Sequence, residues 1–236
     1  MVGGLASVAG SVLAGYAGLG IELKYLIAAS FMAAPGGLLM AKLIIPETEK
    51  VDNHIVLETK EDNQACNVID AAATGAISGL KLAANVGAML LAFIALTALL
   101  NIILGGITSA FGFDNITIEW ILGYLFAPLA FIIGVPADEM LQAGSFIGQK
   151  IAVNEFFAYA KFIEIKSELS ELSQIIITFA LCGFANLGSI AVLLGGIGTM
   201  APHRRHEIAK LGFRAMLAAT LANLMSATIA GLFFAI

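Results

Sequence analysis

The segment that decides the fold class is 172–203, LSQIIITFALCGFANLGSIAVLLGGIGTMAPH. It contains no Asp, Glu, Lys or Arg, and it exceeds the roughly 20 helical residues that cross the hydrocarbon core of a bilayer. Gly183 and Gly188 bracket Asn186 near its middle, and glycine permits a helix to unwind locally. The segment therefore predicts a transmembrane helix that is interrupted in its middle.

The rest of the chain repeats this pattern of long runs without charge. Of its 236 residues, 59% are hydrophobic and 12% are charged, whereas an ordinary soluble domain is about 25% charged. An ionisable group at the centre of a bilayer is costly, so uncharged runs locate the membrane spans. The chain is therefore predicted to be an all-α polytopic membrane protein, with these further runs: 1–21, 25–41, 82–113, 120–137 and 215–236.

The composition also argues against several classes of function. Twelve Lys and Arg against 17 Asp and Glu leave no basic face for a nucleic-acid backbone. Cys66 and Cys182 are too few for a disulfide framework or a cysteine zinc site. The sequence has neither the Gly-x-Ser-x-Gly nor the His-Glu-x-x-His motif. We therefore expect neither an enzyme nor a nucleic-acid-binding protein.

Charged residues gather in two connecting segments. The acidic segment 46–66 is predicted to be an aqueous loop. The basic cluster 203–206 is predicted to lie on the cytoplasmic side, because positive residues are enriched in cytoplasmic loops. His203 and His206 are three residues apart and have two interpretations, metal ligands or solvated residues among arginines. The second is favoured because no acid or cysteine completes a metal site.

The segment 120–160 does not have the pattern of a simple transmembrane helix. Its apolar first part ends at Pro136 and two acidic residues, and its second part carries Lys150 and Glu155. Irregular backbone at membrane depth is tolerated where it lines a cavity. A re-entrant helical hairpin or a broken helix fits this segment, and together with the interrupted run it predicts a fold that contains partly unwound helices.

Glu155 is the acidic residue that most needs an explanation. It lies in the stretch VNEFF, and no cation stands within one helical turn of it. A carboxylate in such apolar surroundings is neutral, is paired with another element, or faces a watery cavity. Its alternatives are a functional acid and an interface residue near a helix end. Acids within a membrane are functional candidates by default, so the first is favoured.

Asn186 and Ser189 share one helical face because they are three residues apart. With a carboxylate, their amide and hydroxyl groups suit a ligand with several hydroxyls, such as a sugar. Hydrogen bonding between helices explains them equally well. Ser7 and Val8 precede Gly10 in the first run, and carbonyls freed at a break there would coordinate a small cation. A serine bonded to its own helix is the alternative there.

The stretch GQKIAVNEFFAY at 148–159 closely resembles the G-x-K-x-x-x-N-E-F-x-A-Y signature of concentrative nucleoside transporters. Phe157 is its one internal departure, since valine is more usual there. Three other stretches resemble the same family, and they are GSVLAGY at 10–16, ASFMAAPGG at 29–37 and CGFANLGSI at 182–190. The resemblance extends over essentially the whole chain.

The resemblance implies a secondary transporter that carries nucleosides inward, driven by a sodium or proton gradient, with no cofactor beyond a sodium ion. By this likeness, Glu155 holds ribose hydroxyls, Asn186 and Ser189 contact the ribose, and Phe184 lies beside the nucleoside. Ser7 and Val8 align with the helix that supplies part of the sodium site. Leu187 and Gly188 depart from the serine-rich version of the motif around them.

The resemblance also implies a setting and a length. Members form homotrimers in the cell's inner or plasma membrane and cross it several times, and each protomer has a scaffold and a moving transport subdomain. This chain matches the C-terminal part of such a protein over 1–236, without the early helices and the first hairpin. We therefore expect a part of a longer transporter. The alternative is a truncated or split membrane subunit that is incompetent alone and needs a partner chain.

Overall fold

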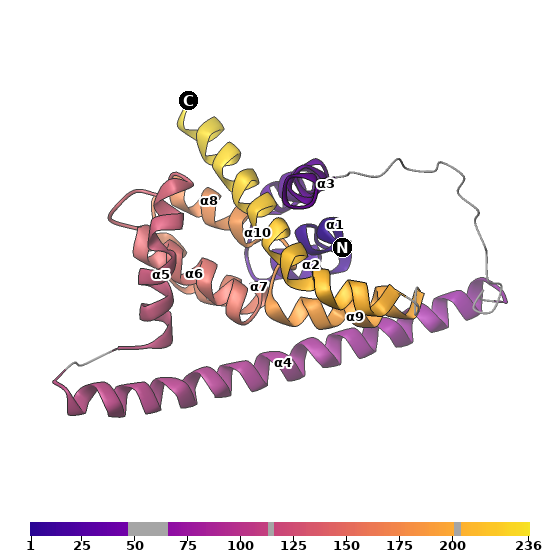
Figure 1. Cartoon of the computed structure of the whole chain (residues 1–236), viewed down its shortest axis with the longest axis horizontal. Helices are drawn as coiled ribbons and strands as arrows, with labels where there is room; N and C mark the ends of the chain where they lie inside the picture. The colour runs from indigo at the N-terminus through magenta and orange to yellow at the C-terminus, as the bar shows by residue number, and fades with distance from the viewer. Residues whose placement is uncertain (47–65, 113–115, 201–203) are drawn as a thin grey trace. The chain divides into compact units, whose positions relative to one another are not determined.

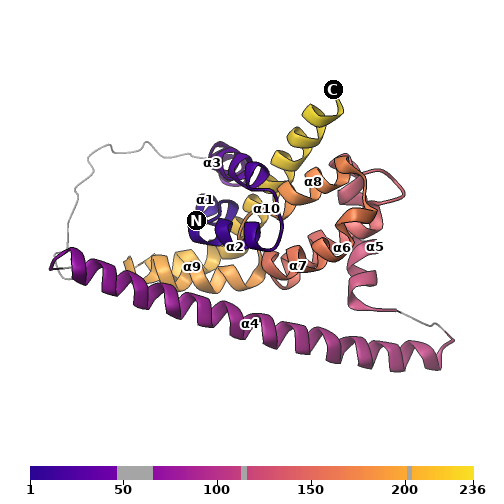
Figure 2. The ribbon, with the colours of Figure 1, turned by 180° about the vertical axis from the view of Figure 1, so that it is seen from behind.

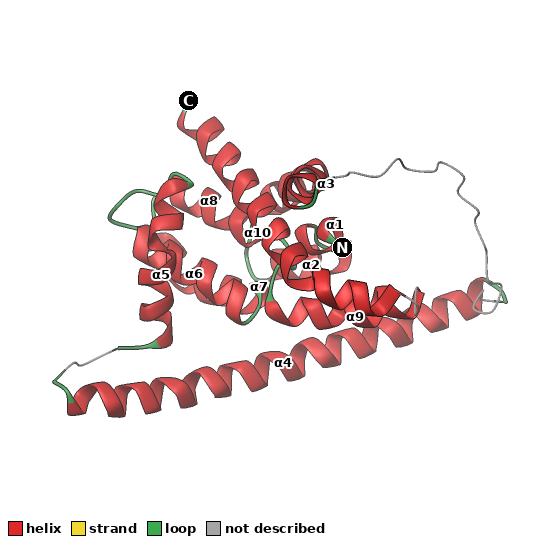
Figure 3. Cartoon of the chain, in the orientation of Figure 1, coloured by secondary structure: helices red, strands yellow, loops and turns green. Residues whose placement is uncertain are grey.

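A computed structural model describes residues 1–46, 66–112, 116–200 and 204–236, and every regular element in these ranges is a helix (Figures 1 and 3). The chain divides into two compact units, one made of 1–46 with 104–236 and the other of 47–103. The predicted all-α membrane fold is confirmed in its class. Two helices among the described residues, α3 (Leu23–Ile44) and α10 (Arg205–Ala235), are long and apolar enough to cross a membrane.

The long helix α4 (Val68–Ala110) has 43 residues and contains most of the uncharged run predicted at 82–113. A local exchange of hydrogen bonds marks where it begins. The side-chain oxygen of Asn67 accepts a bond from the Asp70 backbone N–H at 2.8 Å, and the Asp70 carboxylate accepts one from the Cys66 N–H at 2.9 Å. This reciprocal arrangement satisfies N–H groups that have no partner within the helix.

The first unit contains two interrupted helices. The sequence predicts the interruption of 172–203, whereas for 1–21 it leaves open a break or a serine bonded to its own helix. The run 1–21 forms α1 (Val2–Ala6) and α2 (Gly10–Gly18), with an extended segment between them. The run 172–203 forms α8 (Glu171–Leu181) and α9 (Leu187–Met200), and residues 182–186 between them are not helical. Each break frees backbone groups in the interior of a helix pair. These groups must then find partners elsewhere.

The segment 120–160 is more broken than its two-part pattern suggests. It forms α5 (Ile118–Ile132), α6 (Met140–Ala152) and α7 (Glu155–Ile165), followed by the short 3₁₀ helix η2 (Lys166–Glu168). The turn near Pro136 was predicted, but the second break, between α6 and α7, was not. Its cause is local, because the Asn154 side chain accepts a hydrogen bond from the Phe157 N–H at 2.8 Å and thereby starts a new helix.

Helices α5 and α6 pack against each other through glycine. A Cβ atom on Gly144 would lie 2.6 Å from the backbone nitrogen of Ala127 and 2.7 Å from the carbonyl oxygen of Gly123. Such a small separation lets the two backbones touch.

The turn after α5 is connected to the start of α8, because the Glu139 carboxylate accepts bonds from the N–H and the hydroxyl of Ser170, each at 2.7 Å.

Helix α10 is the element around which the unit is assembled, and it contacts α1, α3, α8 and α9. Figure 2 shows the same helices from behind. Its buried face consists mainly of small residues, with a few large apolar ones and with the polar Thr220, Asn223 and Ser226. Small residues allow close helix packing in a membrane protein, where apolar contact alone does not drive helices together.

The two charged connecting segments are described only in part. Residues 47–65 of the predicted acidic loop lie outside the described residues, as does His203. His206 is exposed in the first turn of α10, and Arg204 pairs with Glu207 at 2.8 Å. Within the described ranges, no three His, Cys, Asp or Glu residues are grouped in a way that would hold a metal ion.

Candidate functional site

The carboxylate of Glu155 is the centre of a buried polar cluster. Glu155 is the first residue of α7, directly after the break, and only 5% of it is exposed. Its Oε1 accepts a hydrogen bond from the Tyr16 hydroxyl at 3.1 Å, and its Oε2 accepts one from the Asn186 side-chain N–H at 2.8 Å. The carboxylate therefore joins α2, α7 and the α8–α9 break.

Asn186 extends this cluster to the start of α9. Its side-chain oxygen accepts bonds from the backbone N–H of Ser189 at 2.8 Å and from the Ser189 hydroxyl at 3.0 Å. Asn186 is 3% exposed and Ser189 is 9% exposed. The two residues thus act together, as their spacing suggests, and their partner is the carboxylate of Glu155.

The cluster retains capacity for further hydrogen bonds. A carboxylate has about four acceptor positions, and the bonds from Tyr16 and Asn186 occupy two of those of Glu155. The Ser189 hydroxyl donates to Asn186 and keeps its own acceptor lone pairs. Vicinal hydroxyls, each a donor and an acceptor, match such a set of a carboxylate, an amide and a hydroxyl.

The other predicted site residues lie at the two helix breaks. Phe184 is half-buried in the segment between α8 and α9, and its carbonyl accepts the Asn186 N–H at 2.9 Å. Ser7 and Val8 lie in the extended segment between α1 and α2 and are half-buried. Among the described residues, no hydrogen bond joins Ser7 or Val8 to Glu155, Asn186 or Ser189.

Tyr16 is a member of the cluster that sequence reasoning missed. It is fully buried, and its ring packs on Tyr159 with centroids 4.8 Å apart and on Phe156 at 5.9 Å. The signal was the single tyrosine of the apolar run 1–21, since a buried tyrosine hydroxyl usually has a partner. Its partner, however, is 139 residues away along the chain.

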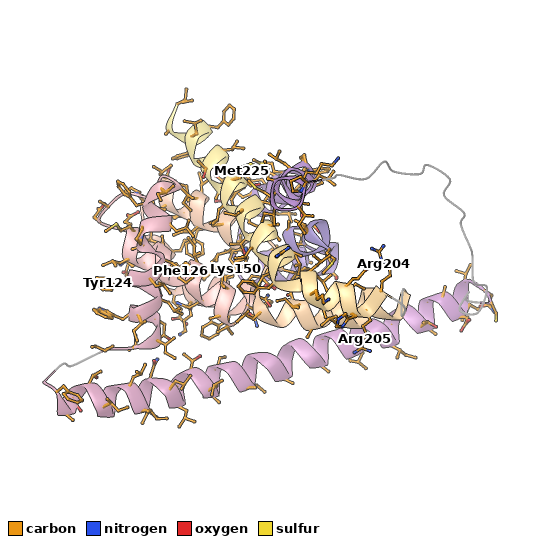
Figure 4. All side chains as sticks on the ribbon, viewed as in Figure 1. Tyr124, Phe126, Lys150, Arg204, Arg205 and Met225 are labelled. Carbon is orange, nitrogen blue, oxygen red and sulfur yellow. The ribbon has the colours of Figure 1, made fainter. Side chains whose placement is uncertain are left out.

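A second polar network lies beside the first and was also missed. Lys150, which is labelled in Figure 4, is 1% exposed. Its ammonium group donates to the carbonyl of Ala180 at 2.8 Å and to the side-chain oxygen of Asn223 at 3.2 Å. The Asn223 amide donates to the carbonyls of Ala6 at 2.9 Å and Cys182 at 2.6 Å. This network therefore reaches both helix breaks.

Comparison with known proteins agrees with this architecture. The family described as "Na+ dependent nucleoside transporter C-terminus" matches residues 25–231. The nucleoside permease NupC of Helicobacter pylori is 49% identical over 235 residues, which are 98% of this chain and 56% of the permease.

Two solved structures of CNTnw are also similar. One is in an inward-facing, substrate-bound state, with 57% identity, a TM-score of 0.93, and coverage of 99% of this chain and 56% of that one. The other, which carries two substitutions, is in an outward-facing state. It has 57% identity and a TM-score of 0.96, and the match covers 99% of this chain and 57% of that one. The chain thus spans little more than half the length of these relatives. It belongs to the family of Na+-dependent, or concentrative, nucleoside transporters, which are membrane transporters and not enzymes.

Proposed function

We propose that this chain takes part in cation-coupled nucleoside uptake by alternating access, as part of a longer protein. Glu155, Asn186 and Ser189 would hold the ribose hydroxyls, and Phe184 would lie beside the nucleoside. The observation that carries the proposal is the buried carboxylate of Glu155, which accepts bonds from Tyr16 and Asn186 at the meeting of broken helices. Relatives in inward-facing and outward-facing states support the mode of transport.

The coupling cation is the second part of the proposal. The family description names Na+, and Ser7 and Val8 lie in the non-helical segment between α1 and α2, where the helical hydrogen-bond pattern is interrupted. These two residues would supply part of a sodium site, with proton coupling as the alternative. A cation shifts the transport equilibrium only through different affinities for the two states. Sodium bound near Ser7 would favour the loaded, closed state.

The proposal includes the setting of the chain in the cell. We place it in the inner or plasma membrane as a multi-pass protein and a homotrimer, with the start of α10 on the cytoplasmic side. The exposed Arg204, Arg205 and His206 at that end support this orientation. The segment 120–160 would form a re-entrant hairpin, and 46–66 an aqueous loop.

A second candidate function follows from the length of the chain. It spans 56% of the Helicobacter pylori permease and 57% of a solved CNTnw chain. A protein of this extent would be a transport-incompetent subunit that completes its site with a partner chain. Both candidates use the same ribose-binding residues, and they differ in whether the rest of the transporter is joined to this chain or is supplied by a separate partner chain.

Uptake of radiolabelled uridine and adenosine into proteoliposomes tests the proposal. The 236-residue chain and a full-length relative are reconstituted side by side, each with and without a sodium gradient. Sodium-stimulated uptake by this chain alone contradicts the second candidate. Uptake by the relative alone, with nucleoside still bound by this chain, supports the shared ribose site and shows that the rest of the transporter is needed, whether joined to this chain or supplied by a partner. Failure of this chain both to bind and to transport any nucleoside contradicts both.

A further inference from the structure

We propose that Lys150 and Asn223 form a positioning pair that fixes the crossing of the two broken helices and thereby holds Asn186 and Ser189 in place for the ligand. The inference rests on the nucleoside site proposed above. Neither residue touches the proposed ligand groups in any hydrogen bond of the described residues. Their effect on binding would therefore be exerted through the backbone of the breaks and, for Lys150, also through its electrostatic attraction to the Glu155 carboxylate.

The helix breaks leave backbone carbonyls without their usual partners within the helix. Ala6 is the last residue of α1, and Ala180 and Cys182 lie at the end of α8, where helix carbonyls lose their usual partners. The pair supplies donors to all three, at 2.9, 2.8 and 2.6 Å respectively. An unsatisfied carbonyl inside a membrane protein costs free energy, so these bonds define the arrangement that the breaks adopt.

The charge of Lys150 is stabilised by neutral acceptors at the end of α8. No Asp or Glu of the described chain forms an ion pair with its ammonium group, which faces the carbonyl of Ala180 and the amide oxygen of Asn223. Carbonyls at the C-terminal end of a helix carry the negative end of the helix dipole, which favours a cation. Lys150 therefore acts as a tethered cation at the end of α8.

The backbone at Gly183 packs closely against Ala6 and Asn223 where the two broken helices cross. Gly183 has a φ of +143°, and a Cβ atom there would lie 2.5 Å from the Ala6 carbonyl oxygen and 2.6 Å from the side-chain nitrogen of Asn223. The segment between α8 and α9 is thus seated directly on α1 and on the positioning pair. Asn186 follows three residues later and bonds to Glu155, so a shift at Gly183 moves the proposed ribose contacts.

Lys150 and Asn223 connect the helix break that presents Glu155 with the one that presents Asn186. Lys150 is in the last turn of α6, and Glu155 begins α7 across the break at Val153 and Asn154. Lys150 therefore connects the α6–α7 break, which presents Glu155, to the α8–α9 break, which presents Asn186. Asn223 adds the continuous helix α10 and the end of α1. The two residues thus connect the α1–α2, α6–α7 and α8–α9 breaks.

Two substitutions test the pair by removing defined donors. Lys150→Met removes the donor to Ala180 and keeps the apolar stem. Asn223→Asp keeps an acceptor for Lys150 but removes both donations to the Ala6 and Cys182 carbonyls. We expect each variant to weaken uridine binding to the purified chain about tenfold or more, because small misplacements of polar groups cost affinity steeply. Asn223→Ser, which keeps one donor, would give an intermediate loss and is the milder variant for folding.

Matched controls separate positioning from stability. Phe162→Leu loosens the buried contact with Phe146, whose ring centroid is 5.6 Å away, and lowers the unfolding temperature without touching the pair. Lys161→Met removes an exposed cation of α7 that pairs with Glu164. Both controls would bind uridine as the unsubstituted chain does. The uridine affinity of each pair variant is compared with that of a control whose unfolding temperature is lowered by a similar amount.

The outcomes distinguish the two proposals. If the unsubstituted chain binds uridine, and the pair variants bind it as well as Phe162→Leu at a similar unfolding temperature, the pair is only structural and the inference is wrong. If the unsubstituted chain binds no nucleoside, the proposed function fails and this inference fails with it. A transport assay of competent protein adds a further readout, because a positioning role predicts a raised KM with a smaller change in kcat.

Discussion

Glu155→Gln is expected to abolish nucleoside binding. The substitution keeps the size of the side chain, but it removes the charge and places an N–H donor where Tyr16 and Asn186 now both donate. One of those two donors then has no acceptor, and the ribose hydroxyls lose a charged partner. Hydrogen bonds to charged groups contribute about 1.5–3 kcal/mol each, so losing two corresponds to a fall in affinity of at least about a hundredfold.

The measurement is isothermal titration of the purified variant with uridine and adenosine. Glu164→Gln is the matched control, since Glu164 lies on the same helix, is exposed, and pairs only with Lys161 among the described contacts. The control would bind like the unsubstituted chain. Near-normal nucleoside affinity in Glu155→Gln would remove the carboxylate from the proposed site.

Gly183→Ala is expected to disrupt the α8–α9 break and, with it, both folding and binding. A φ of +143° is a conformation that side-chain-bearing residues rarely adopt, and it costs about 1–3 kcal/mol. The new methyl group would also meet the Ala6 carbonyl and the Asn223 amide at 2.5–2.6 Å. Overpacking of this kind costs about 1–3 kcal/mol more. We therefore expect a sharply lower unfolding temperature and loss of measurable uridine binding.

Thermal unfolding in detergent, followed by fluorescence, measures the first effect. Gly4→Ala is the control, because a Cβ atom at Gly4 in α1 has no heavy atom of the described chain within 4 Å. It replaces glycine by alanine in a helix and would leave the unfolding temperature nearly unchanged. An unfolding temperature for Gly183→Ala equal to that of the control would contradict the close seating of this break on α1.

The interruption of the run 172–203 was predictable from the sequence because its cause is local. Gly183 lies in the break between α8 and α9, whereas Gly188 is already the second residue of α9. The break before Glu155 has an equally local cause, the capping by Asn154, yet it was missed. A strongly apolar segment hides a cap, since the hydrophobic pattern continues across it.

The candidate site was only half predictable. Glu155 stood out as an acid among aromatics, and Asn186 with Ser189 stood out as polar residues on one face between glycines. Tyr16 and Asn223 did not stand out, because their roles depend on contacts between residues far apart in the chain. Tyr16 bonds to a residue 139 positions away, and Asn223 to one 217 positions away. No periodicity in the sequence encodes such pairings.

The central claim is that the carboxylate–amide cluster binds the hydroxyls of a ribose. Titration of the purified protein with uridine and with 2′,3′-dideoxyuridine in sodium buffer tests it most directly, since the two ligands share their base and differ only in these hydroxyls. A site built to hydrogen-bond a hydroxyl leaves its own polar groups unpaired when that hydroxyl is absent. We predict that 2′,3′-dideoxyuridine binds at least about a hundredfold more weakly than uridine. Equal affinities for the two ligands would contradict it.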